Sequence, residues 1–127
     1  MAHGRFSLTV EGEEKLIKLM SELNWTEKRP EALKLAFAKG LSAETVPVER
    51  EGKKSDFVIG NGVIAKGEDY ILYKHILIEK TGMTLDAKAV DDYIVRYIEQ
   101  GLDLIMQEID SLSELDNYFL YLVNKHT

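Results

Sequence analysis

Polar and apolar residues alternate strictly over residues 5–10, near the start of the chain. A period of two is typical of a half-buried strand, because successive side chains of a strand point to opposite faces. The pattern therefore predicts a strand that buries Phe6, Leu8 and Val10 on one face. The residues expected on the opposite face are Arg5, Ser7 and Thr9.

A first helix is predicted over residues 11–24. Leu16, Leu19, Met20 and Leu23 recur there at spacings of three and four, and acidic residues occupy the first turn. Both features are typical of an amphipathic surface helix, since acidic side chains interact favourably with a helix N-terminus.

A second helix is predicted from Thr26 to Gly40. Threonine is a common N-cap, and Pro30 falls in the first turn, where its missing N–H costs no hydrogen bond. Gly40 is interpreted as a left-handed C-cap. The order of strand, helix, turn and helix over residues 1–41 is that of a ribbon-helix-helix element.

Residues 42–67 are predicted to form a loop followed by a small hairpin. The segment up to Lys54 is polar, contains Pro47 and shows no periodicity. The dipeptide Asn61-Gly62 then separates two short apolar runs, and Asn-Gly in that setting is a strong hairpin signal.

Three further helices are predicted over residues 68–127. The first spans Glu68 to Thr81 and is closed by Gly82, and the second and longest begins at Asp86. A capping box at residues 111–114 opens the last helix. The fold class is therefore mainly α: a ribbon-helix-helix-like β-α-α N-terminus followed by a small hairpin and three helices.

Length and composition limit the kind of protein. A chain of 127 residues predicts a single domain over residues 1–127, and the absence of cysteine excludes disulfides and thiolate chemistry. No signal-peptide pattern or membrane span is expected, which favours a cytoplasmic protein. Residues 1–46 carry equal numbers of basic and acidic side chains, so the net charge of −6 belongs to the rest.

No residue pattern points to catalysis. The Gly60-Asn61-Gly62 segment lacks the lysine and following helix of a phosphate loop, and carboxylates on the long helix are the usual background of a solvated helix face. The histidines His3, His75 and His126 show no metal-ligand or catalytic spacing. We expect no catalytic residue, no metal and no cofactor.

The ribbon-helix-helix interpretation carries a DNA-binding hypothesis. In that arrangement two strands pair across a dimer, and their outward side chains enter a major groove. Arg5, Ser7 and Thr9 have the reach and hydrogen-bonding groups to contact base edges, and Lys28 and Arg29 would flank a phosphate at a helix start. The alternative is that the strand pairs within its own subunit. Several glutamates next to the strand oppose insertion, because like charge near phosphate is costly.

The segments together resemble the DndE family of DNA sulfur modification (phosphorothioation) proteins. The resemblance rests on Phe6-Ser7-Leu8-Thr9 with the helix after it, on Ala32 to Leu41 ending in Gly-Leu, and on two later stretches, Ala65 to Asp69 and Tyr97 to Leu102. Gln100 stands where the family more usually has a basic residue.

The resemblance implies a mainly helical fold, self-association as a dimer or tetramer, and a DNA-related role without catalysis. It also implies that surface basic residues face DNA, including nicked duplex. The basic residues in the matching region are Lys15, Lys18, Lys28, Arg29 and Lys34.

Three functional hypotheses follow. The leading one is a cytoplasmic, non-catalytic accessory subunit of a DNA sulfur modification system, related to restriction-modification, that binds DNA or scaffolds the other subunits. The second is a ribbon-helix-helix transcription regulator or antitoxin. The third is a protein–protein interaction module whose acidic C-terminal part docks onto a basic partner.

Overall fold

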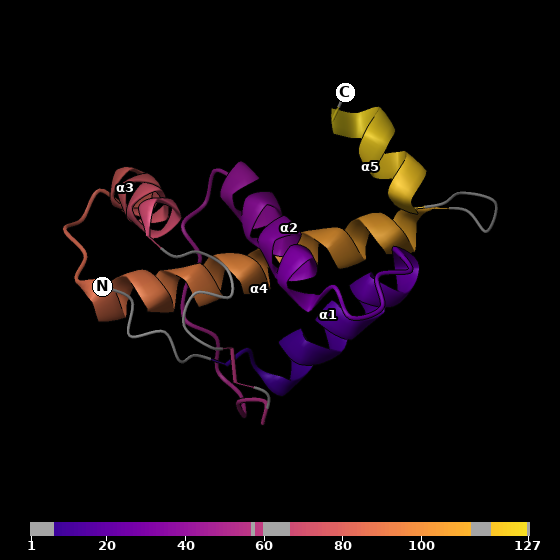
Figure 1. Ribbon diagram of the computed structural model, residues 1–127, viewed down its shortest axis with the longest axis horizontal. Coiled ribbons are helices and arrows are strands. Elements are labelled where there is room, and N and C mark those ends of the chain that lie inside the picture. The colour runs from indigo at the N-terminus through magenta and orange to yellow at the C-terminus, as the bar shows by residue number, and fades with distance from the viewer. Residues whose placement is uncertain (1–6, 57, 60–66, 113–117, 127) are drawn as a thin grey trace.

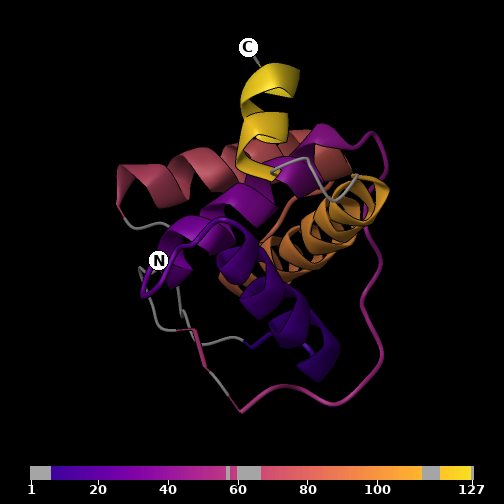
Figure 2. The same ribbon diagram turned by 90° about the vertical axis from the view of Figure 1, so that its right-hand side faces the viewer.

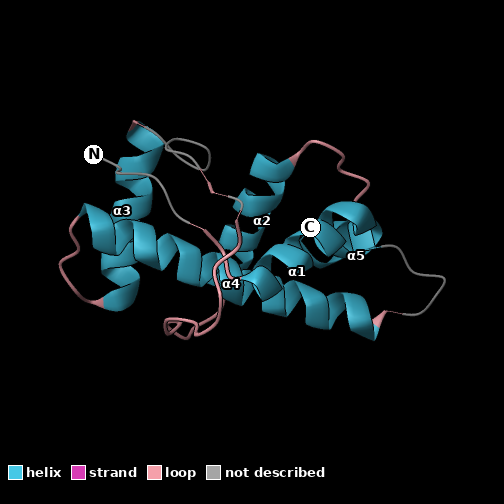
Figure 3. Ribbon diagram, turned by 90° about the horizontal axis from the view of Figure 1, so that it is seen from below, coloured by secondary structure: helices cyan, strands magenta, loops and turns pink. Residues whose placement is uncertain are grey.

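The computed structural model describes residues 7–56, 58–59, 67–112 and 118–126. Within them it is mainly helical, as expected, and its elements are joined by loops (Figure 3). The helices are α1 (Val10–Glu22), α2 (Arg29–Ser42), α3 (Glu68–Thr81), α4 (Ala87–Ser111) and α5 (Tyr118–His126).

The 25-residue helix α4 organises the fold. It runs along the long axis of the molecule, with α1 on one side and α3 and α5 on the other (Figure 1, Figure 2). Helix α2 packs against α4 over the largest interface, and α1 packs on both α2 and α4. Helix α3 touches α4 over a much smaller area, so α4 together with α1 and α2 carries most of the core.

The core forms where the apolar stripes of α1, α2 and α4 meet. Leu16 of α1, Leu33 of α2 and Ile98 of α4 are completely buried. Burial of an aliphatic side chain of this size stabilises a fold by about 1.5–3 kcal/mol. The rings of Phe37 and Tyr97 join α2 to α4 edge to face, with their centroids 6.4 Å apart.

The interface between α2 and α4 depends on two glycines in the helices. A Cβ at Gly40 would overlap the carbonyl oxygen of Tyr97, and a Cβ at Gly101 would overlap the carbonyl oxygen of Ala36. Gly40 is buried within α2, which continues to Ser42. The predicted left-handed C-cap at Gly40 is therefore wrong: this glycine serves close packing of helix backbones.

The N-terminal segment differs from the predicted strand. Thr9 forms an isolated antiparallel bridge with Lys54, and helix α1 already begins at Val10. The pairing is within the chain: Val10 N–H donates to the Lys53 carbonyl over 2.9 Å, and Ser55 N–H donates to the Leu8 carbonyl over 2.8 Å. The described residues thus do not bear out the outward-facing ribbon of a ribbon-helix-helix element; they match the alternative of pairing inside one subunit. Arg5 and Phe6 lie outside the described residues.

Most of the later helix boundaries match the prediction. Helix α3 spans the predicted residues, Gly82 ends it in the left-handed conformation at φ 70°, and the Asp86 side chain caps α4 by accepting from Ala89 N–H over 2.8 Å. Helix α2, by contrast, begins after Lys28, with no side-chain cap, rather than at Thr26.

Two predicted features fall largely outside the described residues. They are the hairpin turn with its second strand, over residues 60–66, and most of the capping box, over residues 113–117. The described Ile59 is buried in the core, and Ser111 is the last residue of α4. Among the described residues, no helix has the length and apolar character needed to cross a bilayer.

Candidate functional site

The residues predicted to contact DNA lie on the N-terminal segment, on α1 and on the start of α2. Ser7 is half-buried and Thr9 is buried, with 5% of its surface exposed. The predicted outward orientation of Thr9 is therefore wrong. Instead of facing a groove, its Oγ1 caps α1 by accepting from Gly12 N–H over 3.0 Å.

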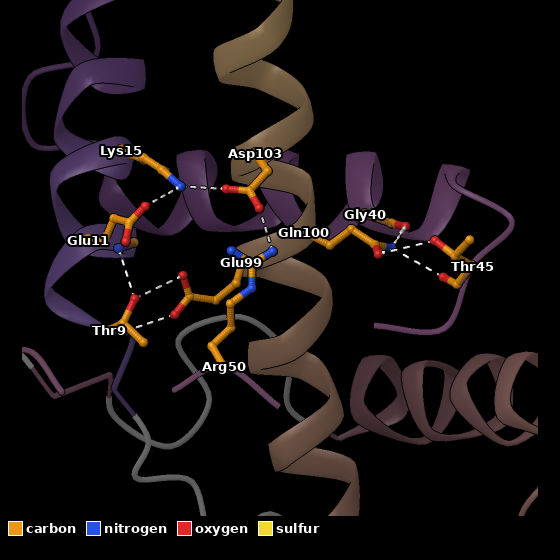
Figure 4. Close-up of polar contacts among 10 residues, drawn as sticks. Thr9, Glu11, Lys15, Gly40, Thr45, Arg50, Glu99, Gln100 and Asp103 are labelled. Carbon is orange, nitrogen blue, oxygen red and sulfur yellow. Dashed lines mark hydrogen bonds and ion pairs between the residues drawn. The ribbon is translucent and has the colours of Figure 1, made fainter. Parts of the chain in front are cut away.

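Thr9 is held by a carboxylate of α4. The backbone N–H of Thr9 donates to Glu99 Oε2 over 2.8 Å, and its hydroxyl donates to Glu99 Oε1 over 3.2 Å. Glu99 is 2% exposed, so these bonds replace the water that its charge loses. The contact fixes the start of α1 to the middle of α4 (Figure 4).

A chain of alternating charges continues along the same side of α4. Lys15 Nζ lies 2.5 Å from Asp103 Oδ1 and 3.1 Å from Glu11 Oε1. Arg50 Nη2, from the loop before α3, lies 2.5 Å from the second oxygen of Asp103. Lys15 is therefore engaged in ion pairs that join α1 to α4 (Figure 4).

These ion pairs shift the pKa of the groups involved. Burial raises the pKa of Asp103, but the hydrogen bonds and positive charges of Arg50 and Lys15 outweigh it and hold that pKa below the ordinary 3.8. Burial likewise lowers the pKa of Lys15, and the hydrogen bonds and charges of Asp103 and Glu11 outweigh it, so the pKa is raised above 10.5. Both groups stay charged at neutral pH.

Two more of the predicted DNA contacts are paired with acids. Arg29 Nη1 lies 2.5 Å from Glu13 Oε2, which joins the start of α2 to α1. Lys18 is half-exposed, and its Nζ lies 3.6 Å from Asp110 Oδ1. The pair with Asp110 is long and solvated, so its strength is expected to be below about 1 kcal/mol.

Lys28 and Lys34 are the predicted contacts that remain free for a phosphate. Both are exposed and form no ion pair within the described ranges. Around them, the same two helices and their turn expose four glutamates that are also without an ion pair in those ranges. These are Glu14, Glu22, Glu27 and Glu31. The unpaired charge of this surface is therefore acidic on balance.

Sequence reasoning missed the roles of Arg50, Glu99 and Gln100. Arg50 lay in a loop without periodicity, and Glu99 looked like a solvated helix acid. Gln100 donates from Nε2 to the carbonyls of Gly40 and Thr45, each over 3.2 Å, and so holds the end of α2 and the loop after it. The one sequence feature that could have indicated a shared role for Glu99 and Asp103 is their spacing of four residues, which places both on the same face of α4.

The described residues offer no metal cluster, since no group of three or more His, Cys, Asp or Glu converges there. His75 is exposed on α3. His3 lies outside the described residues, and nothing is described of the side chain of His126.

Three large apolar side chains on α3 and just after it are exposed. Ile71 and Leu72 each leave 55% of their surface exposed, and Met83 leaves 45%. Helix α3 buries Tyr70 and Leu77, and its Tyr73 ring packs on Phe37 of α2 with the centroids 4.7 Å apart. Its opposite side thus presents large apolar side chains to solvent.

Comparisons with known proteins give a likeness of fold. No family model matches the chain, and no curated protein matches it. The solved structure of a glycine-to-lysine mutant of DndE, described as involved in DNA phosphorothioation, matches with a TM-score of 0.64 and 20% identity over 82% of this chain and 98% of that one. The crystal structure of DndE from Escherichia coli B7A, described as involved in DNA phosphorothioation modification, matches with a TM-score of 0.62 and 21% identity over 81% and 97%.

The predicted resemblance to DndE is thus confirmed in the fold. The match covers nearly the whole of both DndE chains and about four fifths of this one, so the fold is shared over most of the chain.

Proposed function

We propose that this DndE-like chain is a non-catalytic accessory subunit of a DNA sulfur modification (phosphorothioation) system. The observation that carries the proposal is the fold match over 97–98% of two DndE chains. A match of that extent supports a common role better than a shared helical motif would.

A non-catalytic role accords with the use of the carboxylates around α4. Glu99, Asp103 and Glu108 all accept hydrogen bonds or ion pairs from side chains of their own chain. A general acid or base needs a pKa near the working pH, whereas the ion pairs of Asp103 lower its pKa. These carboxylates stabilise the fold.

The role of the subunit is mainly to assemble the complex. Three of the five basic residues named by the family resemblance already pair with acids at 2.5–3.6 Å: Lys15, Lys18 and Arg29. Phosphate would have to displace those partners, and the exposed glutamates nearby would repel it. DNA contact is therefore confined to Lys28 and Lys34, and protein contacts carry the assembly.

The exposed pair Ile71 and Leu72, near the start of α3, is the proposed site of self-association. Large apolar side chains gathered on one face mark protein interaction sites in soluble proteins. The dimer or tetramer expected from the resemblance would bury this surface. A transcription regulator is less well supported, because Leu8 and Thr9 pair with residues 53–55 of their own chain.

A DNA-binding experiment tests the DNA-contacting part of the proposal. Intact and nicked duplexes are titrated at two salt concentrations with the wild type, with the double variant Lys28→Glu/Lys34→Glu, and with Lys88→Glu as a control on exposed α4 surface. The double variant should bind more weakly and with a flatter salt response, and the control should match the wild type. Equal binding by all three would refute the assignment of these lysines.

The scaffolding part is tested by mass in solution and by co-purification with the other proteins of the system. The wild type should be heavier than the 14.5 kDa monomer, and Ile71→Asp/Leu72→Asp should be monomeric and fail to co-purify. Ile17→Asp introduces the same charge at an exposed apolar residue of α1 and should change neither result. A monomeric wild type would overturn the assembly proposal.

A further inference from the structure

A cavity of about 410 Å³ lies between the middle of α4, the N-terminal segment and the loop before α3. Three positions one helical turn apart on α4 contribute Asp92, Arg96 and Glu99, and the loop contributes Arg50 and Lys54 across from them. The loop crosses the middle of α4 (Figure 3), and Arg50 lies beside Glu99 there (Figure 4). The volume is within the range of small-molecule sites.

Arg96, a side chain of this cavity, uses only part of its hydrogen-bonding capacity within the described residues. Its Nε is buried and has no hydrogen-bond partner in the described part of the chain. Its Nη2 reaches Glu49 only at 3.7 Å, and Glu49 itself is 77% exposed. A buried donor without a partner is costly, and such a group calls for an acceptor.

The orientation of Arg96 is nevertheless fixed. Its guanidinium carbon lies 4.5 Å from the centre of the Tyr93 ring, one turn earlier on α4. Stacking on an aromatic ring holds the planar group and leaves its edge donors available for a bidentate acceptor. The side chain is thus held in place while its acidic partner, Glu49, lies at the long distance of 3.7 Å.

Lys54 supplies a second positive charge. Its backbone is fixed by the bridge to Thr9, and its exposed side chain forms no ion pair within the described ranges. Arg50, in contrast, is committed to Asp103 at 2.5 Å. Two cations, Arg96 and Lys54, therefore remain for a ligand, and the half-buried Ser7 adds a hydroxyl.

The acidic residues of the cavity restrict which chemical groups the ligand can have besides its negative charge. Glu99 accepts two hydrogen bonds from Thr9, and the exposed Glu49 lies 3.7 Å from Arg96 Nη2, whereas Asp92 is exposed and has no ion pair within the described ranges. A free carboxylate accepts hydrogen bonds from hydroxyl groups and repels further negative charge. Val58 and Val95 add an apolar wall.

We propose that this cavity binds a small phosphate monoester with a hydroxylated organic part, such as a sugar phosphate or a mononucleotide. A monoester carries close to two negative charges at neutral pH and several acceptor oxygens, which suits Arg96 and Lys54 together. The hydroxyl groups of the organic part donate to Asp92. This site is separate from Lys28, Lys34 and the α3 surface, so the proposal stands or falls independently of the proposed function.

Calorimetric titration of the full chain with ribose 5-phosphate and with AMP tests the proposal, and adenosine serves as the unphosphorylated control. We expect saturable binding of both monoesters at a ratio of one per chain, and none of adenosine. Arg96→Gln and Lys54→Gln should each weaken binding at least about tenfold, since each removes a charge-assisted hydrogen bond. Lys88→Gln removes one charge from exposed α4 surface and should leave binding unchanged.

A competition experiment identifies the source of the monoester. Displacement of ribose 5-phosphate by a DNA oligonucleotide with a 5′-phosphate, and not by the same oligonucleotide without it, would assign the site to a DNA end. No displacement by either would assign it to a free metabolite. Lack of saturable binding of the monoesters at millimolar concentration would overturn the proposal, as would unchanged binding by Lys54→Gln, whose exposed side chain the fold does not need.

Discussion

The close contact between α2 and α4 makes Gly101→Ala the most direct test of how this fold is held together. Alanine is the better helix former by about 1 kcal/mol, so helix propensity alone predicts that the substitution stabilises the protein. The added Cβ would, however, overlap the carbonyl oxygen of Ala36 and approach Gly40 N to 2.8 Å. These are backbone atoms of a packed helix, which cannot move aside as the end of a flexible side chain could.

Relief of the overlap requires α2 and α4 to separate, which loosens the largest interface of the molecule. Overpacking of this kind costs about 1–3 kcal/mol and more where backbone must shift. We therefore expect a net loss of about 2 kcal/mol in the free energy of unfolding. With an m-value of about 1.5 kcal/mol/M, the urea midpoint would fall by about 1.3 M.

Urea denaturation followed by circular dichroism measures this shift. Ala38→Gly, on the exposed side of α2, is the matched control, because it changes helix propensity without entering the interface. It should cost about 1 kcal/mol. If Gly101→Ala proved as stable as the wild type or more so, propensity would outweigh packing and the assignment of a backbone-to-backbone contact at this position would be wrong.

Three further predictions concern polar contacts between the helices. Thr9→Ala should cost about 1–2 kcal/mol because it removes the N-cap of α1 and a bond to Glu99, while Thr9→Ser should retain most of the stability in the same urea titration. Asp103→Asn should cost about 1 kcal/mol of unfolding free energy at pH 7. Because the pKa of Asp103 is lowered in the folded state, this difference from the wild type should be present above pH 3.8 and shrink as the pH falls below it. A constant difference from pH 7 to pH 3 would contradict the ion-pair account. Lys39→Met should cost about 2 kcal/mol, because it removes the buried ammonium partner of Glu108 at 2.7 Å and leaves the more exposed Lys125, at 2.8 Å, to balance that carboxylate; Lys39→Met/Glu108→Leu should recover part of the loss.

The helices were predictable where local signals agreed with packing. Glycine after Thr81 and aspartate before Ala87 mark the end of α3 and the start of α4, because both residue types satisfy helix termini by local geometry. Gly40 carries the same local signal, but tertiary contact with α4 decides its role. A glycine that ends a helix and one that lets two helices touch are indistinguishable until the partner is known.

The predicted N-terminal strand is a second case in which a local sequence pattern fits two structures. The alternation over residues 5–10 fits a strand, but Thr9 followed by an acidic turn also fits an N-cap, and the latter is what the structure has. The ion pairs that engage Lys15 and Arg50 join residues far apart in sequence, so their pairing could not be read from charge patterning along the chain. The cavity around Arg96 escaped prediction for the same reason: one wall is a loop without periodicity.

The position of α4 late in the chain has a consequence for biosynthesis. Helices α1 and α2 are complete at Ser42, but the helix that buries their apolar faces ends at Ser111, about 70 residues later. At a synthesis rate of about 5–20 residues per second, the α1–α2 pair waits roughly 4–14 s for its partner. During that interval Leu33 and Phe37 have no α4 to cover them, so a ribosome-associated chaperone or rapid completion of synthesis matters more for this fold than for one whose helices pack in sequence order.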